Sequence, residues 1–463
     1  MHREVNASSD NQLFGTNGIR GVINETLTPD FVLRIAESIG TFFEGGEVII
    51  GYDSRTSNLM LAEIVSSGLA ATGCTVHLGG LAPTPCIQFT ARNQRLDGGI
   101  MITASHNPPQ FNGIKVLGND GVEIPRQEEA EIEEIFSTAK AEHASWQRIG
   151  RKRALPEAHE EYKEAIKKHI DPETVGRKNY RVVVDPVNGV GGLITPRLLK
   201  ELGCRVTTIN ADIDGTFPSR TPEPRPESLH ELSTIVKTEQ ADLGVAFDGD
   251  ADRAIFVDEK GEVQWGDRTF AIIEEFLLER NQVEKIVTPV SSSQVVKDVA
   301  DKHGAKTILT RVGSTAVSHT MKKSSAKLGG EENGGVFYGP HQPVRDGAMT
   351  TALVLNVMAK TGKKLSDLIN ALPRYHLEKD TIKCPINLKP MILEELISKV
   401  RDHNLSHDTI DGVKIWYPDN SSILIRPSGT EPLYRFYAEA KAKARASELV
   451  REYKRKLTAM IHP

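Results

Sequence analysis

The sequence predicts an α/β protein with three successive α/β units and a smaller α+β domain at its C-terminus. Short apolar runs alternate with helical stretches three times before residue 371, a pattern typical of sheets covered by helices on both faces. The chain has 463 residues, whereas a single hydrophobic core stops growing at roughly 250 to 300 residues. Several domains are therefore expected.

The first unit begins with a helix over residues 28–42. Thr28 can cap this helix, Pro29 suits its first position, and apolar residues recur near helical spacing. Apolar runs and a helical stretch then predict strand, helix and strand at residues 46–55, 58–73 and 74–80.

The same order of elements returns twice. Strand, helix and strand are expected at residues 179–192, 194–203 and 204–210, and again at 284–290, 293–304 and 305–313. After residue 382 the pattern changes to strands at 412–418, 421–429 and 433–442, followed by a long charged helix. We place the domains at 1–150, 151–257, 258–370 and 371–463.

Composition excludes several classes of protein. The chain has 57 basic and 62 acidic residues, a net charge of -5, and no basic block that would follow a nucleic-acid backbone. No apolar run approaches the roughly 20 residues that span a bilayer, and the N-terminus carries no export signal, so a cytoplasmic protein without a membrane partner is expected. The four cysteines lack CxxC spacing, which predicts buried reduced thiols.

The stretch "TASHNPPQFNGIKV" at residues 103–116 follows an expected buried strand at 98–104. Ser105 therefore lies at a strand's carboxyl end, where open α/β sheets bind ligands. Two prolines favour a rigid loop that holds one side chain outward. Adjacent side chains on an extended chain point to opposite sides, so His106 is not expected to act as the base for Ser105. A tight turn with a capping serine is the alternative.

The stretch "FDGDADR" places three carboxylates, Asp248, Asp250 and Asp252, at the end of another apolar run. Converging carboxylates repel one another unless a cation lies among them, which predicts a hard divalent metal. An EF-hand is disfavoured because its sixth position needs Gly where Arg253 stands, and because the flanks are typical of strands. A solvated acidic turn is a further alternative. Arg253 is well placed to bind a phosphate group.

The stretch "LGGEENGG" places Glu331 and Asn333 two residues apart between glycine pairs. A carboxylate and an amide can accept from and donate to sugar hydroxyls, and glycine permits a close approach. A polar hairpin turn explains the pattern equally well.

The stretch "IRPSGTEP" combines one guanidinium, two hydroxyls and a glycine, which together can bind a phosphate group. A plain turn with an incidental arginine is the alternative. The four motifs together fit a phosphosugar held at both ends in a cleft between domains. The candidate phosphate ligands here are Arg426, Ser428, Gly429 and Thr430.

With "FGTNGIRG" near the N-terminus, these motifs follow one another along essentially the whole chain. In this the sequence resembles the α-D-phosphohexomutase family, which includes phosphoglucomutase/phosphomannomutase and phosphoglucosamine mutase. The resemblance implies three similar mixed-sheet α/β domains and a smaller α+β domain around a central cleft. It also implies that Ser105 carries a phosphoryl group, and that the three aspartates hold Mg²⁺ together with the phosphoserine.

The implied reaction passes the phosphoryl group from Ser105 to a sugar 1-phosphate. The resulting 1,6-bisphosphate reorients and returns its other phosphate, which leaves the sugar 6-phosphate; a glucose 1,6-bisphosphate-type activator is implied. By the same resemblance Arg20 and His106 belong to the catalytic set, and Lys115 handles the hydroxyl proton. Arg253 would stabilise charge on the moving phosphoryl group.

The chain departs from the family pattern at two places that concern the sugar. Many members have Glu-x-Ser-Gly-His where this chain has Asn333 and Gly335, and Arg311 stands where a substrate-contacting lysine is often found. Phosphoglucomutase/phosphomannomutase is the main interpretation, with phosphoglucosamine mutase and phosphopentomutase as alternatives. A metal-dependent phosphatase and a non-catalytic sugar-phosphate binding protein are also considered. A homodimer is a candidate assembly.

Overall fold

The computed structural model describes residues 12–402, 405–429 and 431–461. The chain divides into two compact units. Unit 1 comprises the chain up to Gln264 together with Pro340–Gly362, and unit 2 comprises Trp265–Gly339 together with Lys363–Pro463. Unit 1 is therefore built from two separate stretches of sequence.

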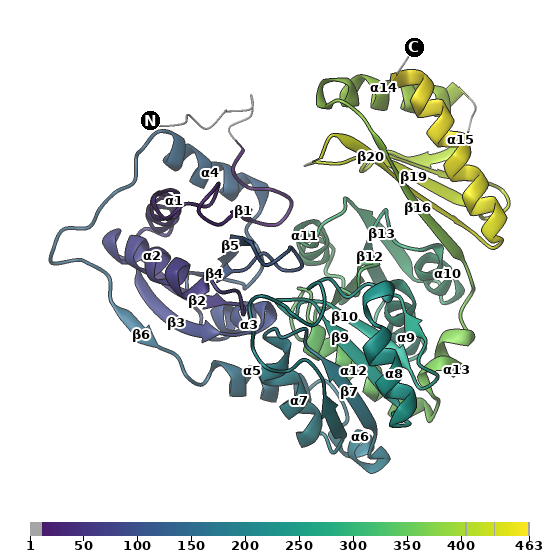
Figure 1. Cartoon of the computed structure of the whole chain (residues 1–463), viewed down its shortest axis with the longest axis horizontal. Coiled ribbons are helices and arrows are strands. Elements are labelled where there is room, and N and C mark those ends of the chain that lie inside the picture. Colours follow the sequence, from purple (N-terminus) through teal and green to yellow (C-terminus); the bar gives the residue numbers. More distant parts are fainter. Residues whose placement is uncertain (1–11, 403–404, 430, 462–463) are drawn as a thin grey trace. The chain divides into compact units, whose positions relative to one another are not determined.

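The first sheet of unit 1 is mixed, with the strand order β1-β5-β4-β2-β3-β6 (Figure 1). Strands β4, β2, β3 and β6 pair in parallel, and β5 is antiparallel to both of its neighbours. The strands are β1 (Ile19–Val22), β2 (Glu47–Tyr52), β3 (Thr75–Leu81), β4 (Gly98–Ile102), β5 (Phe111–Gly118) and β6 (Lys152–Ala154). The helices between them are α1 (Pro29–Phe42), α2 (Asn58–Ala71), α3 (Thr84–Asn93) and α4 (Arg126–Ser137).

The second sheet of unit 1 has the order β11-β10-β9-β7-β8. Its strands are β7 (Arg181–Asp185), β8 (Arg205–Thr208), β9 (Leu243–Phe247), β10 (Ala254–Asp258) and β11 (Val263–Gln264). The helices are α5 (Ala158–Lys167), α6 (Pro172–Lys178), α7 (Gly191–Glu201), the 3-10 turn η1 (Pro226–Ser228), α8 (His230–Thr238) and α12 (Gly347–Thr361). Helix α12 comes from the later stretch of sequence and packs against α5, α6, α7 and β10.

The first sheet of unit 2 is also mixed, with the order β13-β12-β14-β15. Strand β12 pairs in parallel with both neighbours, and β14 and β15 form an antiparallel hairpin. The strands are β12 (Lys285–Pro289), β13 (Lys306–Thr310), β14 (Leu328–Gly330) and β15 (Val336–Tyr338). The helices are α9 (Gly266–Leu278), α10 (Gln294–Lys302), α11 (Ser314–Ser324) and α13 (Leu365–Asn370).

The last sheet is antiparallel, with the order β16-β20-β19-β18-β17. The strands are β16 (His376–Lys383), β17 (Ser406–Asp408), β18 (Val413–Trp416), β19 (Ser422–Pro427) and β20 (Leu433–Ala440). The 3-10 turn η2 (Ile386–Leu388) and the helices α14 (Lys389–Asp402) and α15 (Lys443–Ile461) complete it. Three mixed sheets, each with its helices, and a C-terminal α+β domain confirm the predicted fold class.

Local sequence accounts for where the elements begin. The Thr28 hydroxyl accepts a hydrogen bond from the Phe31 N–H at 3.4 Å, and Pro29 opens α1, as the sequence predicts. Val32, Ile35 and Ile39 lie buried on one side of this helix. The first helix is thus fixed by a cap and one apolar face.

Two expectations from composition can be compared with the structure. All four cysteines are buried free thiols, which confirms that prediction. Burial raises the pKa of the Cys204 thiol to about 12, so it stays protonated at neutral pH. Within the described residues, no helix has both the length and the apolar character needed to cross a bilayer.

Candidate active site

Ser105 lies in the loop that follows β4, at the carboxyl end of that strand. Its backbone adopts a left-handed conformation with φ +50°, and its N–H donates to the Thr103 hydroxyl at 2.8 Å. The Ser105 hydroxyl donates to Asp248 Oδ2, also at 2.8 Å. The structure therefore brings the serine into direct contact with the acidic motif.

Two expectations about this loop are wrong. The Ser105 side chain does not point outward but is fully buried, because the loop packs against the β9–β10 turn and Gly249 lies beside the Ser105 carbonyl. The hydroxyl also lies 3.4 Å from His106 Nδ1, so the two side chains do not point to opposite sides. The alternation argument assumes an extended chain, and the left-handed backbone at Ser105 breaks that assumption.

A buried guanidinium holds the Ser105 loop in place. Arg55 donates to four backbone carbonyls, three in the Ser105 loop and one at the start of β5, at 2.6 to 2.9 Å, and to Asp53 Oδ2 at 3.2 Å. Asp53 is itself buried and accepts from the Thr103 hydroxyl at 2.5 Å. The loop is thus fixed by polar contacts to one buried guanidinium. The four carbonyls belong to Ser105, Asn107, Pro108 and Phe111.

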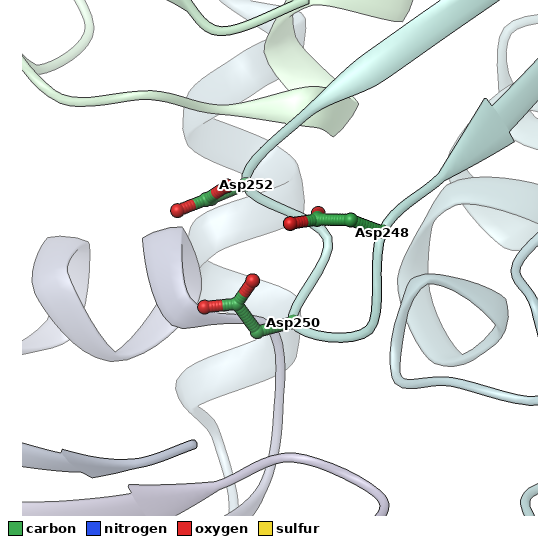
Figure 2. Close-up of side chains that lie close together, drawn as sticks. All are labelled: Asp248, Asp250 and Asp252. Atoms are coloured by element: carbon green, nitrogen blue, oxygen red, sulfur yellow. The ribbon is translucent and has the colours of Figure 1, made fainter. Parts of the chain in front are cut away.

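Asp248, Asp250 and Asp252 lie on the single turn between β9 and β10, and Figure 2 shows their carboxylates directed to the same side of that turn. One oxygen atom from each lies within 4.8 Å of the other two. All three side chains are buried, so the solvated acidic turn is wrong. The flanking elements are strands, which excludes an EF-hand.

The electrostatics of the trio are those of crowded carboxylates. Burial, followed by Asp252 and Asp250, raises the pKa of Asp248 well above its usual value. Burial also opposes ionisation of Asp250, but Lys115, the Thr84 hydroxyl and Arg345 outweigh it and lower the pKa of that carboxyl. Burial and crowding therefore oppose ionisation of Asp248, whereas the neighbouring cations keep Asp250 ionised.

Four cationic side chains surround the trio. Lys115 Nζ lies 3.0 Å from Asp250 and 3.6 Å from Asp252, and these carboxylates with Glu123 outweigh burial and raise the pKa of the lysine. Arg345 lies 2.6 Å from Asp252. Arg253 Nε is 3.8 Å from Asp248 and 3.7 Å from Asp252.

The fourth cation is Arg20, whose Nη1 donates to the Asn107 side-chain oxygen at 2.5 Å. The charge of Arg253, burial and the charge of Arg20 lower the pKa of His106 far below its usual range. His106 is therefore neutral at physiological pH. It can accept or donate one proton at a hydrogen bond but adds no charge.

The residues present fit a hard divalent cation. Asp250 Oδ1 and Asp252 Oδ1 are buried and have no hydrogen-bond partner among the described residues. Leaving two such oxygens without a partner is costly, and carboxylate oxygens are the ligands that Mg²⁺ prefers. The acidic turn therefore has the donor atoms of a metal site.

In unit 2, Glu331 and Asn333 lie on the loop that joins β14 to β15. Glu331 is buried, and its N–H donates to the Gly335 carbonyl at 2.8 Å. The Asn333 side-chain oxygen accepts from the Gly335 N–H at 3.2 Å. The stretch is thus a polar hairpin turn in which Glu331 is buried and Asn333 is half-buried.

The "RPSGTEP" stretch begins with the last two residues of β19, Arg426 and Pro427, and Thr430 lies outside the described residues. Arg426 Nη2 lies 3.1 Å from Asp411, and the Ser428 hydroxyl accepts from the Glu431 N–H at 3.2 Å. A side chain at Gly429 would meet no atom within 4 Å, so the backbone there is open to a ligand.

Arg311 and Arg426 come together at one loop of unit 2. Arg311 Nε donates to the Ile410 carbonyl at 3.1 Å, next to the Asp411 that pairs with Arg426. The Val312 N–H also donates to Asp411, at 3.1 Å. Two candidate ligands that are far apart in sequence therefore share one supporting loop.

Sequence reasoning missed several residues of the site in unit 1. Thr84, Arg345 and Arg55 contact the trio or the serine loop, but none lies in a motif with an evident chemical signature. Arg55 follows an apolar run in "GYDSR", which is the one signal that could have marked it as a strand-end residue. Arg345 lies in a stretch without such a signal.

Comparisons with known proteins cover nearly the whole chain. Residues 11–143, 160–261 and 265–375 match the alpha/beta/alpha domains I, II and III of phosphoglucomutase/phosphomannomutase, and residues 382–456 match the C-terminal domain. The phosphoglucosamine/phosphogalactosamine mutase of Sulfurisphaera tokodaii is 43% identical over 453 residues, 96% of this chain and 98% of the relative.

A second relative and a solved structure agree. The phosphoglucomutase/phosphomannomutase of Thermococcus kodakarensis is 43% identical over 442 residues, 94% of this chain and 96% of that protein. The crystal structure of a phosphoglucomutase/phosphomannomutase family protein from Burkholderia thailandensis is similar with a TM-score of 0.88 and 29% identity, covering 97% of this chain and 98% of that one. The chain therefore belongs to the phosphoglucomutase/phosphomannomutase family of α-D-phosphohexomutases.

Proposed function

We propose that the protein interconverts sugar 1-phosphates and sugar 6-phosphates through a phosphorylated Ser105 and a sugar 1,6-bisphosphate. The observation that carries this proposal is the 2.8 Å hydrogen bond between the Ser105 hydroxyl and Asp248 in a buried ring of carboxylates and cations. These buried carboxylates and cations can surround a doubly charged phosphoryl group on the serine and keep water away from it.

We propose a task for each charged or polar side chain around Ser105. Arg253 and Arg20 would bind the phosphoryl oxygens and stabilise charge during transfer. Lys115, held charged by its three acidic neighbours, would donate a proton to the Ser105 oxygen as it leaves and take up the proton that the attacking sugar hydroxyl loses, so that it ends the step charged again. His106, neutral and 3.4 Å from the serine hydroxyl, would orient that hydroxyl.

Mg²⁺ is the proposed ion, bound by Asp248, Asp250, Asp252 and the phosphorylated Ser105. When bound it would neutralise the carboxylates and polarise the phosphoryl group. Asp248, which accepts from the Ser105 hydroxyl, would hold the ion next to the serine, because all three aspartates come from one short turn. Glucose 1,6-bisphosphate or a similar compound is the proposed activator that phosphorylates the serine.

Burial of the Ser105 hydroxyl sets a requirement on this mechanism. A sugar hydroxyl can reach the phosphoryl group only if side chains around Ser105 move, because the residue is 0% exposed. The surrounding groups are polar and charged rather than apolar, so they can exchange their contacts for contacts to a phosphosugar. Conformational steps of this kind often limit turnover.

Unit 2 supplies the proposed contacts to the remainder of the substrate. Glu331 and Asn333 would bind sugar hydroxyls, and Arg426, Ser428, Gly429, Thr430 and Arg311 would bind the phosphate group that is not being transferred. The relatives are named for glucose, mannose, glucosamine and galactosamine phosphates. Phosphoglucomutase/phosphomannomutase activity is our main proposal, with phosphoglucosamine mutase as the second. A homodimer and a cytoplasmic location stay predictions.

The test compares glucose, mannose, glucosamine and ribose 1-phosphates, each with Mg²⁺ and a trace of glucose 1,6-bisphosphate. We expect the 6-phosphate as the product (the 5-phosphate for ribose) and almost no release of inorganic phosphate. The sugar with the highest kcat/KM is the preferred substrate. Stoichiometric release of inorganic phosphate would instead identify a phosphatase.

Ser105→Ala should abolish isomerisation, whereas Ser137→Ala on the exposed face of α4 should not. An unchanged rate in Ser105→Ala would refute the phosphoserine route.

A further inference from the structure

The carboxylates of Asp250 and Asp252 are each divided between two tasks. In both residues Oδ1 lacks a hydrogen-bond partner among the described residues, and the nearest charge to Asp252 Oδ1 is Arg253 Nε at 3.7 Å. Oδ2 is held by Thr84 in Asp250 and by Arg345 in Asp252, and Lys115 Nζ lies near both Oδ2 atoms, at 3.0 Å and 3.6 Å. When side chains hold one oxygen of a carboxylate, the direction in which its second oxygen points is fixed as well. The groups that hold Oδ2 therefore decide where a metal would meet Oδ1.

Thr84 holds Asp250 through two contacts. Its hydroxyl donates to Asp250 Oδ2 at 2.7 Å, and its N–H donates to the Asp250 carbonyl at 3.0 Å. Thr84 opens α3, is 1% exposed and is uncharged. It can orient the carboxylate without competing with a cation for its charge.

Arg345 holds Asp252 at 2.6 Å and is brought there by the segment 341–347. This segment is anchored by the buried Asp346, which caps α12 and accepts from the Tyr162 hydroxyl at 2.5 Å. The Gly347 N–H donates to the Ala251 carbonyl at 3.3 Å, on the acidic turn itself. The segment that carries Arg345 is therefore fixed at Asp346 and Gly347, and Arg345 itself through its guanidinium.

We propose that Thr84 and Arg345 are positioning residues of the metal site, which turn Asp250 Oδ1 and Asp252 Oδ1 toward the ion. This inference rests on the proposed metal site and goes beyond it, because it assigns the accuracy of that site to two residues outside the acidic motif. They come from two stretches of sequence more than 200 residues apart, so the site exists only once both pack on the acidic turn.

The test measures Mn²⁺ binding to the unphosphorylated full-length protein by calorimetry or electron paramagnetic resonance, without substrate. Thr84→Val keeps the shape and the N–H contact but removes the hydroxyl, and Arg345→Met removes the guanidinium. We expect each to weaken Mn²⁺ binding by roughly 10- to 100-fold, the usual effect of losing a group that orients a metal ligand. Thr84→Ser and Arg345→Lys should recover part of the loss.

Arg92→Met is the matched control. Arg92 donates to the His341 carbonyl at 2.7 Å and so supports the same segment without touching the aspartates. It should lower the melting temperature but leave Mn²⁺ affinity within about 2-fold. Because Arg345 is a cation beside a cation site, a pure charge effect would make Arg345→Met bind Mn²⁺ more tightly.

The outcomes separate this inference from the metal site itself. If the parent protein binds no Mn²⁺, the proposed metal site fails. If the parent binds Mn²⁺ and Thr84→Val binds it equally well, the role of Thr84 is refuted. Parental or tighter binding by Arg345→Met refutes the role of Arg345, and a loss in Arg92→Met as large as in Arg345→Met reduces that role to support of the fold.

Discussion

The contact between Lys115 and Asp250 shows how tightly charge is balanced in the site. The lysine is 1% exposed and also faces Asp252 and Glu123, each at 3.6 Å. A buried cation without carboxylates would lose its proton, and carboxylates without a cation would take one up. The positive charge of Lys115 and the negative charges of its carboxylate neighbours therefore depend on one another.

Asp250→Asn should remove catalysis while leaving the protein folded. Lys115 keeps two acidic neighbours, so the fold survives, but a metal loses one ligand and several kcal/mol of stabilisation of the transferring phosphoryl group, about 10²-fold or more in kcat. Steady-state kinetics and circular dichroism give both quantities. Asp30→Asn on α1 is the control. Near-parental activity of Asp250→Asn would contradict the role of this carboxylate, and near-parental activity of the unmodified protein in excess EDTA would contradict metal dependence.

Arg55→Lys should destabilise the serine loop. One ammonium cannot replace a guanidinium that serves four carbonyls and Asp53, and each buried polar group left without a partner costs about 1–3 kcal/mol. We expect the free energy of unfolding in urea to fall by ~3 kcal/mol and kcat to fall with it. Arg177→Lys, exposed on α6, should change neither. Equal stability of Arg55→Lys and the parent would show that water replaces the lost bonds.

At the scale of elements, the β9–β10 turn and the serine loop touch through backbone. A Cβ at Gly249 would lie 2.6 Å from the Ser105 carbonyl oxygen, closer than real contacts allow. Neither partner is the flexible end of a side chain. The turn must therefore move away from the loop if residue 249 is anything larger than glycine.

Gly249→Ala should separate the serine from its acidic partner. We expect a loss of roughly 1–3 kcal/mol in stability from overpacking, and about 10²-fold in kcat because a shift near 1 Å misaligns the reacting groups. The measurement is kcat together with the denaturation midpoint. Gly176→Ala in α6, where the nearest atom to a Cβ is at 3.4 Å, should leave both intact. Parental activity in Gly249→Ala would mean that the two loops need not touch.

The elements were predictable from sequence where periodicity and capping agree. Helix α1, strands β2 and β7 and the antiparallel C-terminal strands follow local pattern, and the acidic turn lies between the two strands expected for it. The burial of Ser105 and its approach to His106 were not predictable, because both depend on a left-handed residue and on packing against a turn distant in sequence. Arg345 was missed because its segment reaches the site only through tertiary contacts.

At the scale of the molecule, unit 1 is discontinuous. Of the 15 residues of α12, the run Gly347–Ala359 is buried, although this helix follows the strands of unit 2 in sequence. Helices α5, α6 and α7 would expose apolar surface without it. Unit 1 therefore depends on a helix encoded beyond the first stretch of unit 2.

A fragment ending at Gln264 should not fold cooperatively. It lacks α12 and Arg345, so both a hydrophobic face and a partner of Asp252 are missing. Joining residues 340–362 to it through a flexible linker should restore a single sharp unfolding transition in calorimetry. A cooperative transition in the shorter fragment would show that α12 is dispensable.

The late position of α12 also affects synthesis on the ribosome. The nascent chain must grow by roughly 100 residues beyond the second sheet before this helix exists, which takes about 5–20 s at ordinary elongation rates. During that interval the docking face of α5, α6 and α7 is open to water and to other apolar segments. Slowing translation between codons 265 and 361 should therefore lengthen the aggregation-prone stage of biogenesis.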